Sequence, residues 1–185
     1  MAEILDIVDE EGIPTGEVVD RNIAHSLGIL HRTAHVWLLR EKDDNIQVLL
    51  QKRSQNKDSF PDCFDISSAG HIPAGVDYIS SALRELKEEL GYEAKPDDLI
   101  YCGTRRFFIK ENFHGKNFLD NQISNVYMIW VNKKENEFVL QKEEVSEVQW
   151  FDFYECMKNV EQNRFSHCIY LEELLFIKNK VESLR

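Results

Sequence analysis

The segment that most constrains this chain is GHIPAGVDYISSALRELKEELGY, residues 70–92. A loop with glycine and proline precedes a run whose apolar residues recur at helical spacing, which predicts a helix over Asp77–Leu90. Asp77 is the expected N-cap and Gly91 the expected C-terminal stop. The apolar stripe is expected to face a hydrophobic core and consists of Ile79, Ala82, Leu83, Leu86 and Leu90.

Three carboxylates occupy a different sector of this predicted helix. Glu85, Glu88 and Glu89 project within roughly a third of its circumference, because a helix turns about 100° per residue. Carboxylates this close raise one another's pKa, so they are either screened by water on a solvated face or neutralised by a cation. Oxygen ligands suit Mg²⁺ or Mn²⁺, which also bind substrate phosphates. The preceding loop can bring a backbone carbonyl beside them.

The charge balance argues against one class of function. With 33 acidic and 22 basic residues the formal net charge is -11, which does not suit a general nucleic-acid binder. The longest apolar runs, such as Val126–Val131, are too short to cross a bilayer, and the N-terminus lacks a signal-peptide core. The four cysteines show no paired spacing. We therefore expect a soluble cytoplasmic protein with free thiols and no nucleic-acid or membrane partner.

The rest of the chain predicts a mixed sheet with few helices, and hence an α+β fold. Strands are expected over Ile4–Val8, Glu17–Val19, His35–Arg40, Ile46–Gln51, Cys63–Ser68, Leu99–Ile109, Ser124–Val131 and Val145–Phe151. The polar stretch Lys110–Gln122 is expected to be a mobile hairpin tip, and helices are expected over Asp152–Val160 and Ser166–Leu184. Residues 1–185 are thus interpreted as a single domain with an N-terminal strand or extension (1–30) and C-terminal helices (152–185).

Residues 70–92 resemble the signature of the Nudix hydrolases: Gly, five residues, Glu, seven residues, then Arg-Glu-aliphatic-x-Glu-Glu-x-Gly-aliphatic. The positions that stand at the expected spacing are Gly70, Arg84, Glu85, Glu88, Glu89 and Gly91. Val76 replaces the first Glu, and Tyr92 stands at the last aliphatic position. The resemblance implies an α/β/α sandwich with a mixed sheet and a loop–helix–loop. It also implies cleavage of a diphosphate linked to another moiety, with Mg²⁺, or Mn²⁺ as the alternative.

The resemblance also implies roles for individual residues. Glu88 and Glu89 would bind metal, and Glu85 would bind metal or act as a base. Arg84 would orient a carboxylate, and the Gly70 carbonyl would be a further metal ligand. Family members often add a late acidic residue as ligand or base. The candidates here, which otherwise are solvated loop residues, are Glu143, Glu144 and Glu147.

Other segments resemble the Nudix branch near isopentenyl-diphosphate isomerase, which contains both isomerases and hydrolases. They are DIVDEEGIPTGEVVDR, LHRTAHVWLL, LLQKRSQNKDSFPDCFDISSAGH and LQKEEVSEVQW. The resemblance places the isomerase's catalytic Cys at Ala69 and its catalytic Glu near Asn125, and neither side chain here can transfer a proton. These two positions and the retained helix carboxylates favour hydrolysis over isomerisation.

Two further groups of residues follow from the same branch. His25, His31 and His71 fall near its histidine metal ligands, so they are either a second metal site or hydrogen-bonded histidines. Arg53 and Lys57 match basic residues that hold the diphosphate, although they can also be ordinary cations of a strand end and a loop.

The sequence therefore predicts a metal-dependent pyrophosphohydrolase that acts by water attack on phosphorus. The expected substrate is a small metabolite, either a nucleoside diphosphate linked to another group or an isoprenoid diphosphate. The alternatives are an isopentenyl-diphosphate delta-isomerase and a non-catalytic nucleotide or diphosphate sensor, which Val76 keeps open. The tail from Asp152 onward would cover one edge of the site or support a homodimer.

Overall fold

The structure is a computed structural model that describes residues 3–57, 59–113 and 115–184, with only the backbone at 116 and 117. The expected single domain, 1–185, thus includes residues 1–2, 58, 114 and 185 outside this description. The described strands are β1 (Ile4–Val8), β2 (Pro14–Asp20), β3 (His31–Lys42), β4 (Asn45–Arg53), β5 (Phe64–Asp65), β6 (Ser68–His71), β7 (Ile100–Phe113), β8 (Lys116–Trp130) and β9 (Val145–Asp152). The helices are α1 (Arg21–Leu27), α2 (Tyr78–Leu90), α3 (Phe153–Glu161) and α4 (Leu171–Ser183), with short 3-10 helices η1 (Pro96–Asp98) and η2 (Glu135–Glu137).

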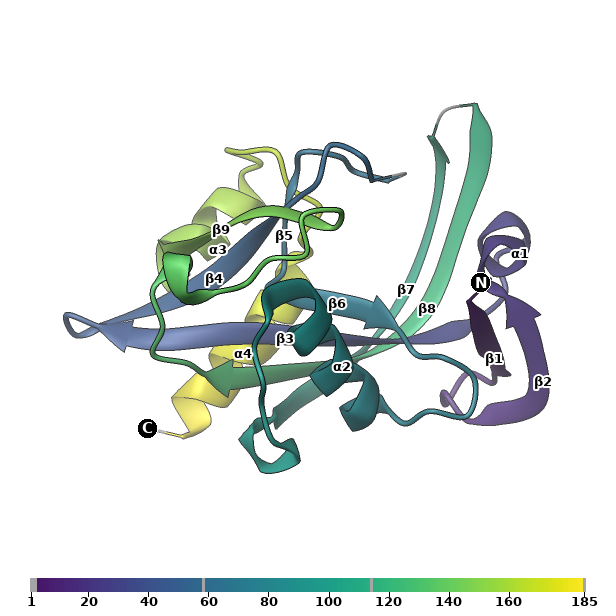
Figure 1. The fold of residues 1–185 in the computed structure, drawn as a ribbon, viewed down its shortest axis with the longest axis horizontal. Coiled ribbons are helices and arrows are strands. Elements are labelled where there is room, and N and C mark those ends of the chain that lie inside the picture. Colours follow the sequence, from purple (N-terminus) through teal and green to yellow (C-terminus); the bar gives the residue numbers. More distant parts are fainter. Residues whose placement is uncertain (1–2, 58, 114, 185) are drawn as a thin grey trace.

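A seven-stranded mixed sheet forms the centre of the molecule (Figure 1). Its order is β5-β4-β3-β8-β7, with β6 pairing β3 and β9 pairing β4. β3 runs parallel to β8, and the other pairings of this sheet are antiparallel. The twelve-residue β3 is long enough to pair with β6 along its first half and with β4 along its second half. β1 and β2 form a separate two-stranded sheet.

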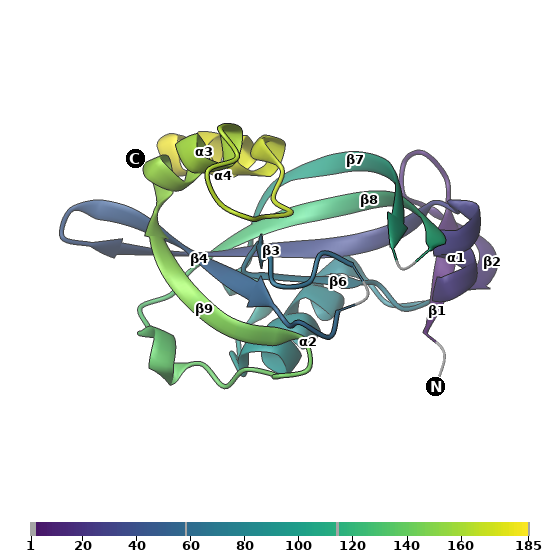
Figure 2. The same cartoon turned by 90° about the horizontal axis from the view of Figure 1, so that it is seen from above.

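Helices cover both faces of the sheet, as the view from above shows (Figure 2). α2 packs on one face, over a core that includes Leu38, Leu49, Leu86, Leu90 and Ile129. α3 and α4 pack on the other face, over a core that includes Trp37, Leu50, Phe153, Leu174 and Ile177. The predicted α+β fold, an α/β/α sandwich with a mixed sheet, is therefore confirmed.

The capping predicted for the signature helix is present in α2. Asp77 accepts hydrogen bonds from the backbone N–H of Ser80 (2.9 Å) and from its hydroxyl (2.6 Å). Gly91 ends the helix in the left-handed region with φ 60, which favours glycine. Ile79, in the first turn, is 39% exposed and Leu83 is half-buried, so the buried part of the predicted stripe consists of Ala82, Leu86 and Leu90.

The prediction that Lys110–Gln122 is a hairpin tip was wrong for most of its length. β7 and β8 remain paired through this stretch, down to Phe113 opposite Lys116; residue 114 lies outside the described residues. Polar residues made the stretch look like a loop. Lys110, Glu111 and Asn112 are exposed strand residues, whereas Phe113, Phe118, Asp120 and Gln122 line a cavity, so this end of the hairpin does not pack under a helix.

Three other expectations need correction. The last helix begins at Leu171, because residues 166–170 run extended and backbone bonds join Phe64 to Ser166 (2.9 Å) and Cys168 (3.0 Å). The predicted strand Cys63–Ser68 is split between β5 and β6. The segment with His25 contains a helix, α1, that was not predicted. Across the described ranges the four cysteines are free, and no helix has both the length and the apolar character to span a membrane.

Candidate active site and metal centre

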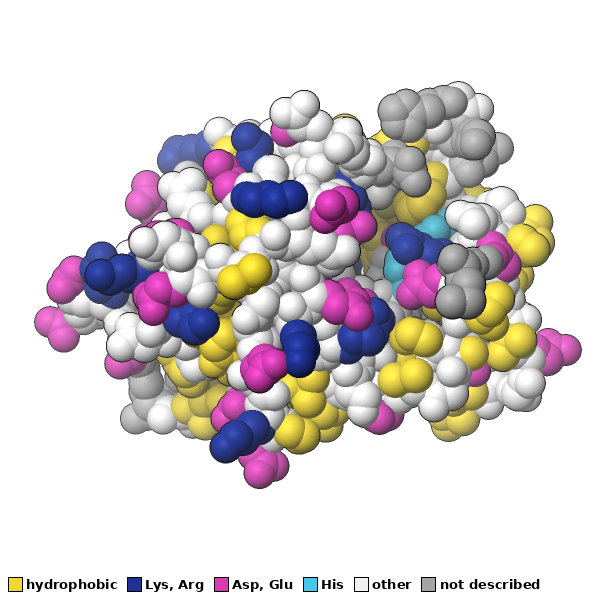
Figure 3. All heavy atoms as spheres, in the orientation of Figure 1, with side chains coloured by type: hydrophobic (Ala, Val, Ile, Leu, Met, Phe, Trp, Pro, Cys, Tyr) yellow, Lys and Arg dark blue, Asp and Glu magenta, His cyan; other side chains and the backbone are white. Residues whose placement is uncertain are grey.

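Two adjoining hollows contain most of the residues singled out from the sequence. The smaller, about 280 Å³, lies over α2 and is lined by Arg84, Glu85, Glu88 and Glu89. The larger, a cavity of about 1290 Å³, lies between β6, α1, the β7–β8 hairpin and the start of α4. The two hollows adjoin through the lining residues that they share, which are Glu3, Arg21, Lys57, Ala69, Gly70, His71 and Glu144. Histidine side chains are visible in this hollowed region, beside acidic and basic ones (Figure 3).

Glu89 is the most buried of the three signature carboxylates, at 7% exposed. Its Oε2 accepts hydrogen bonds from Ser68 Oγ (2.7 Å), the Ala69 N–H (3.3 Å) and Gln51 Nε2 (3.5 Å). Burial, and after it the nearby Glu85 carboxylate, raise the pKa of Glu89 to about 8. A bound cation would favour the charged form of such a carboxyl group, so its surroundings fit a metal ligand.

Arg84 ties the other two carboxylates together. Its Nη2 donates to Glu85 Oε1 (2.5 Å) and to the His71 carbonyl (3.3 Å), and its Nη1 donates to Glu88 Oε2 (2.8 Å). Burial raises the pKa of Glu85 to about 7 although Arg84 opposes the shift. Gly70 lies directly against Glu85, since a Cβ at position 70 would overlap the Glu85 carboxylate. The structure thus brings together the four residues of the predicted metal site, Glu85, Glu88, Glu89 and Gly70, and the arginine predicted to orient them, Arg84.

Val76, which replaces the signature's first glutamate, lines neither hollow. Its side chain packs on the core under α2, and its carbonyl accepts a hydrogen bond from Arg32 Nη2 (2.9 Å). The same Arg32 nitrogen donates to Asp6 Oδ2 (2.8 Å), which also accepts from the Gly75 N–H (2.9 Å). The signature loop is therefore clamped by a carboxylate from β1.

His25, His31 and His71 form a cluster whose ring nitrogens lie within 4.8 Å of one another. His25 comes from α1, His31 from the start of β3 and His71 from the end of β6. Asp120 Oδ1 approaches from β8, 3.6 Å from His31 Nε2 and 3.7 Å from His25 Nε2.

The chemistry of this cluster fits a metal ion. Burial lowers the pKa of His25 to about 3 and also lowers the pKa of His31 and of His71, which leaves neutral imidazoles. Neutral imidazole is the form that binds metals. His31 Nε2 and Asp120 Oδ1 are buried and have no hydrogen-bond partner within the described ranges. Such orphaned atoms facing one another are costly unless a further group satisfies them.

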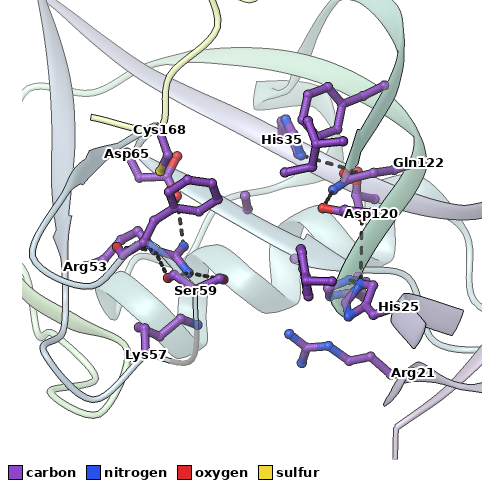
Figure 4. A pocket seen from close by; sticks show the side chains of 18 of the residues that line it. Arg21, His25, His35, Arg53, Lys57, Ser59, Asp65, Asp120, Gln122 and Cys168 are labelled. Carbon is purple, nitrogen blue, oxygen red and sulfur yellow. Dashed lines mark hydrogen bonds and ion pairs between the residues drawn. The ribbon is translucent and has the colours of Figure 1, made fainter. Parts of the chain in front are cut away.

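The predicted phosphate-binding cations differ in how many hydrogen bonds and ion pairs they already make to the protein. Arg53 is committed to the wall of the cavity, because its guanidinium donates to Asp65 (2.9 Å) and to the Ser59 carbonyl (2.9 Å). Lys57 lines both hollows and pairs with Glu144. Arg21, which sequence reasoning missed, also lines both hollows and pairs with Glu3 (3.0 Å), which lines them as well. In Figure 4, Arg53 and Lys57 approach from one side and Arg21 from the other.

Of the candidate late acids, Glu144 lines both hollows and Glu143 the larger one, whereas the exposed Glu147 of β9 lines neither. Asn125 also lies outside the cavity and accepts a hydrogen bond from Thr104 Oγ1 (2.7 Å).

The polar groups that β8 turns toward the cavity are instead those of Asp120 and Gln122 (Figure 4). Their alternation with Asn121 and Ile123 was a usable signal, because strand side chains repeat every second residue.

Comparisons with known proteins identify the family and support the fold. The NUDIX domain family model matches residues 29–168. An uncharacterized Nudix hydrolase of Clostridium acetobutylicum is 44% identical over 145 residues, which are 77% of this chain and 66% of that protein, so the chain spans just under two thirds of that relative. An isopentenyl-diphosphate delta-isomerase of Aliivibrio fischeri is 28% identical over 88% of this chain and 87% of its own. A crystal structure of a Deinococcus radiodurans protein superposes with a TM-score of 0.68 at 18% identity, covering 95% and 98% of the two chains.

Proposed function

Because this chain belongs to the Nudix domain family, we propose that it is a hydrolase that cleaves a diphosphate linkage in a small metabolite with a divalent cation. The observation that carries the proposal is the convergence of Glu85, Glu88, Glu89 and Gly70 on one hollow. That hollow continues into a cavity lined by cations, which suits a phosphorylated ligand in an otherwise acidic protein.

In this proposal Glu88, Glu89 and the Gly70 carbonyl hold Mg²⁺, with Mn²⁺ as the alternative, and Glu85 is a further ligand or the base. Such an ion neutralises phosphate charge and lowers the pKa of bound water. Arg84 keeps Glu85 and Glu88 facing the same hollow through its two hydrogen bonds. Rigid positioning of this kind supports catalysis because the groups need not reorganise during the reaction.

Lys57 and Arg21 are proposed to hold the diphosphate, because both line the two hollows. Arg53 is proposed to act less directly, by fixing the 59–60 loop through its hydrogen bonds to Ser59 and Phe60. Cations that approach a diphosphate from two sides can each donate charge-assisted hydrogen bonds to its terminal oxygens.

Phosphate release from a panel of nucleoside diphosphate derivatives and isoprenoid diphosphates, with Mg²⁺ or Mn²⁺, tests the proposal. We expect Glu88→Gln and Glu89→Gln to lower turnover by about a hundredfold or more. Glu93→Gln is the matched control, because Glu93 follows the same helix but pairs with the exposed Lys87 (2.7 Å) and lines neither hollow. Equal rates in the wild type and both signature variants would refute the hydrolase.

The isomerase remains the alternative that the relatives suggest. Ala69, however, stands where the resemblance places the isomerase's catalytic cysteine, and alanine cannot transfer a proton. Conversion of isopentenyl diphosphate to its allylic isomer by the wild type would establish it.

We also propose that His25, His31 and His71, with Asp120, hold a second ion of the transition-metal type. The orphaned His31 Nε2 and Asp120 Oδ1 support this, as does the mixed nitrogen and oxygen donor set. Metal content and thermal stability, measured with Mn²⁺, Co²⁺ and Zn²⁺, test it without reference to activity. Loss of one bound equivalent in His31→Ala but not in Glu88→Gln is expected; equal content in wild type and His31→Ala would refute it.

A further inference from the structure

Two pairs of oppositely charged side chains stand where the two hollows adjoin. Arg21 Nη1 lies 3.0 Å from Glu3 Oε2, and Lys57 Nζ pairs with Glu144. All four residues line both hollows, so each pair borders the hollow over α2 as well as the larger cavity. The two basic side chains approach from opposite sides (Figure 4). The cations proposed to hold the diphosphate are therefore each paired with an acid of the same site.

These two pairs can open at little cost. Across the residues that the structure describes, the Arg21 guanidinium and the Lys57 ammonium each donate to a single acceptor. The Arg21 side chain is 43% exposed and the Lys57 side chain 22%. Ion pairs that water reaches contribute little to stability, because water screens their charges and can replace either partner. Arg53 differs, since its guanidinium would have to give up several hydrogen bonds to the 59–60 loop and to Asp65.

The acids of the two pairs are anchored through their backbones. The Glu3 carbonyl accepts a hydrogen bond from the Arg21 N–H (2.9 Å), and the Glu144 carbonyl accepts one from the Ser54 N–H (2.9 Å). The Glu144 N–H donates to the Gln141 carbonyl (2.9 Å). A glutamate side chain has several rotatable bonds, so it can change its partner while its backbone stays fixed. Neither pair therefore requires a loop to move when it opens.

The charge in the smaller hollow favours a divalent cation. Its described lining contains three basic side chains, Arg21, Lys57 and Arg84, and five carboxyl groups, those of Glu3, Glu85, Glu88, Glu89 and Glu144. Burial is the main cause of the raised pKa of Glu85, and the charges of Glu88 and Glu3 add to it, so Glu3 acts on the signature carboxylates. With every carboxyl group ionised, the acids exceed the bases by the charge of one divalent cation, and oxygen ligands suit Mg²⁺.

We propose that Glu3 and Glu144 are exchangeable counter-ions of Arg21 and Lys57, and that both pairs change partners when metal and diphosphate bind. The acids then face the divalent cation and the bases face the diphosphate. This rests on the proposed function, because it takes the metal to lie at α2 and the diphosphate to lie between Arg21 and Lys57. Each ligand thus frees the side chains that the other needs, so the two bind with positive cooperativity, and this coupling is reciprocal.

Two affinities measured by titration calorimetry test the proposal: that for Mg²⁺ without phosphate, and that for inorganic diphosphate in EDTA. Mg²⁺ reports on the carboxylates because it prefers oxygen ligands to imidazole. Glu3→Gln and Glu144→Gln should each weaken Mg²⁺ binding and tighten diphosphate binding, both by about three- to fivefold, which is the upper range for an exposed ion pair. Arg21→Gln and Lys57→Gln should shift both affinities in the opposite directions.

Glu143→Gln is the matched control for loss of a negative charge near the site. Glu143 precedes Glu144 and lines the larger cavity, but it makes no ion pair with any residue that the structure describes. The change should alter both affinities by less than about 1.5-fold. Shifts as large as those of Glu144→Gln would show a general effect of charge and would overturn the proposal.

The signs of the shifts separate exchange from structural damage, which would weaken the binding of both ligands. The proposal is overturned if Glu3→Gln or Glu144→Gln weakens both, or changes neither by more than about 1.5-fold. Opposite shifts in a protein that releases no phosphate from any diphosphate would refute only the proposed hydrolase. Phosphate release that depends on Glu88 and Glu89, with unchanged affinities in the Glu3 and Glu144 variants, would refute only the exchange.

Discussion

The substitution Glu173→Gln probes the buried network that holds Arg105. Glu173 is 2% exposed and accepts hydrogen bonds from His35 Nδ1 (2.8 Å), Trp37 Nε1 (3.0 Å) and Arg105 Nε (2.8 Å). Burial by itself raises the pKa of Glu173. The charge and hydrogen bond of His35, the charge of Arg105 and the Trp37 hydrogen bond outweigh burial and bring the pKa from 4.5 down to about 2.

That difference in pKa sets the expected loss of stability. At roughly 1.4 kcal/mol per pKa unit, the ionised Glu173 contributes about 3 kcal/mol to the free energy of unfolding at pH 7. Glu173→Gln removes this charge and leaves Arg105 buried without its partner, so a loss of about 3 kcal/mol is expected. Because the folded pKa is the lower one, the contribution is complete above about pH 4.5 and is lost as the pH falls towards 2. The difference in free energy of unfolding between the wild type and Glu173→Gln should therefore decrease to about 1 kcal/mol at pH 3.

Urea unfolding followed by circular dichroism at pH 7 and pH 3 measures both values. Glu172→Gln is the matched control, because Glu172 is exposed in the same first turn of α4, and it should change stability by less than about 0.5 kcal/mol. Two results would show that this network does not hold Glu173 ionised. One is a loss of unfolding free energy below about 1 kcal/mol in Glu173→Gln at pH 7. The other is a difference between Glu173→Gln and the wild type that is no smaller at pH 3 than at pH 7.

Three further predictions concern α2 and the loop before it. Gly70→Ala should lower phosphate release about 10–100-fold, because the added methyl group displaces the Glu85 carboxylate; unchanged turnover would contradict the close contact. Val76→Glu should change turnover less than about threefold and cost about 1 kcal/mol in urea unfolding, because Val76 lines neither hollow but packs on the core. A rise from undetectable to substantial turnover would instead identify the native chain as a lapsed enzyme. Leu86→Ala should cost about 3 kcal/mol and lower the Tm by about 6–12 °C, since Leu86 is fully buried; a smaller shift in calorimetry would mean that the site collapses around the gap.

The sequence was most informative for α2, where one short segment contains both an apolar pattern of helical period and residues that cap the two ends of the helix. The helix α2 was predicted with its cap Asp77 and its stop Gly91, because side-chain capping and left-handed glycine are local properties. The placement of Glu85 and Glu89 on one hollow followed from helix geometry once that segment was identified.

Residues that depend on distant pairing could not be predicted in the same way. The contacts of Glu173 with His35 and Arg105 join residues 138 and 68 positions apart, and only the packing of α4 on the sheet creates them. Arg53 shows a related limit. The family resemblance suggested a phosphate ligand, but only the fold shows that Asp65 and the Ser59 carbonyl already accept hydrogen bonds from its guanidinium.

The hydrogen bonds by which Asp6 holds the signature loop bear on which residues a functional domain must contain. The region matched by the family model, 29–168, excludes Asp6, whose carboxylate holds that loop, and Glu173, which fixes the cavity floor from the other end. A chimera or a shortened chain cut at the matched boundaries would retain every signature residue. It would nevertheless lose the braces that reach the site from both ends of the sequence.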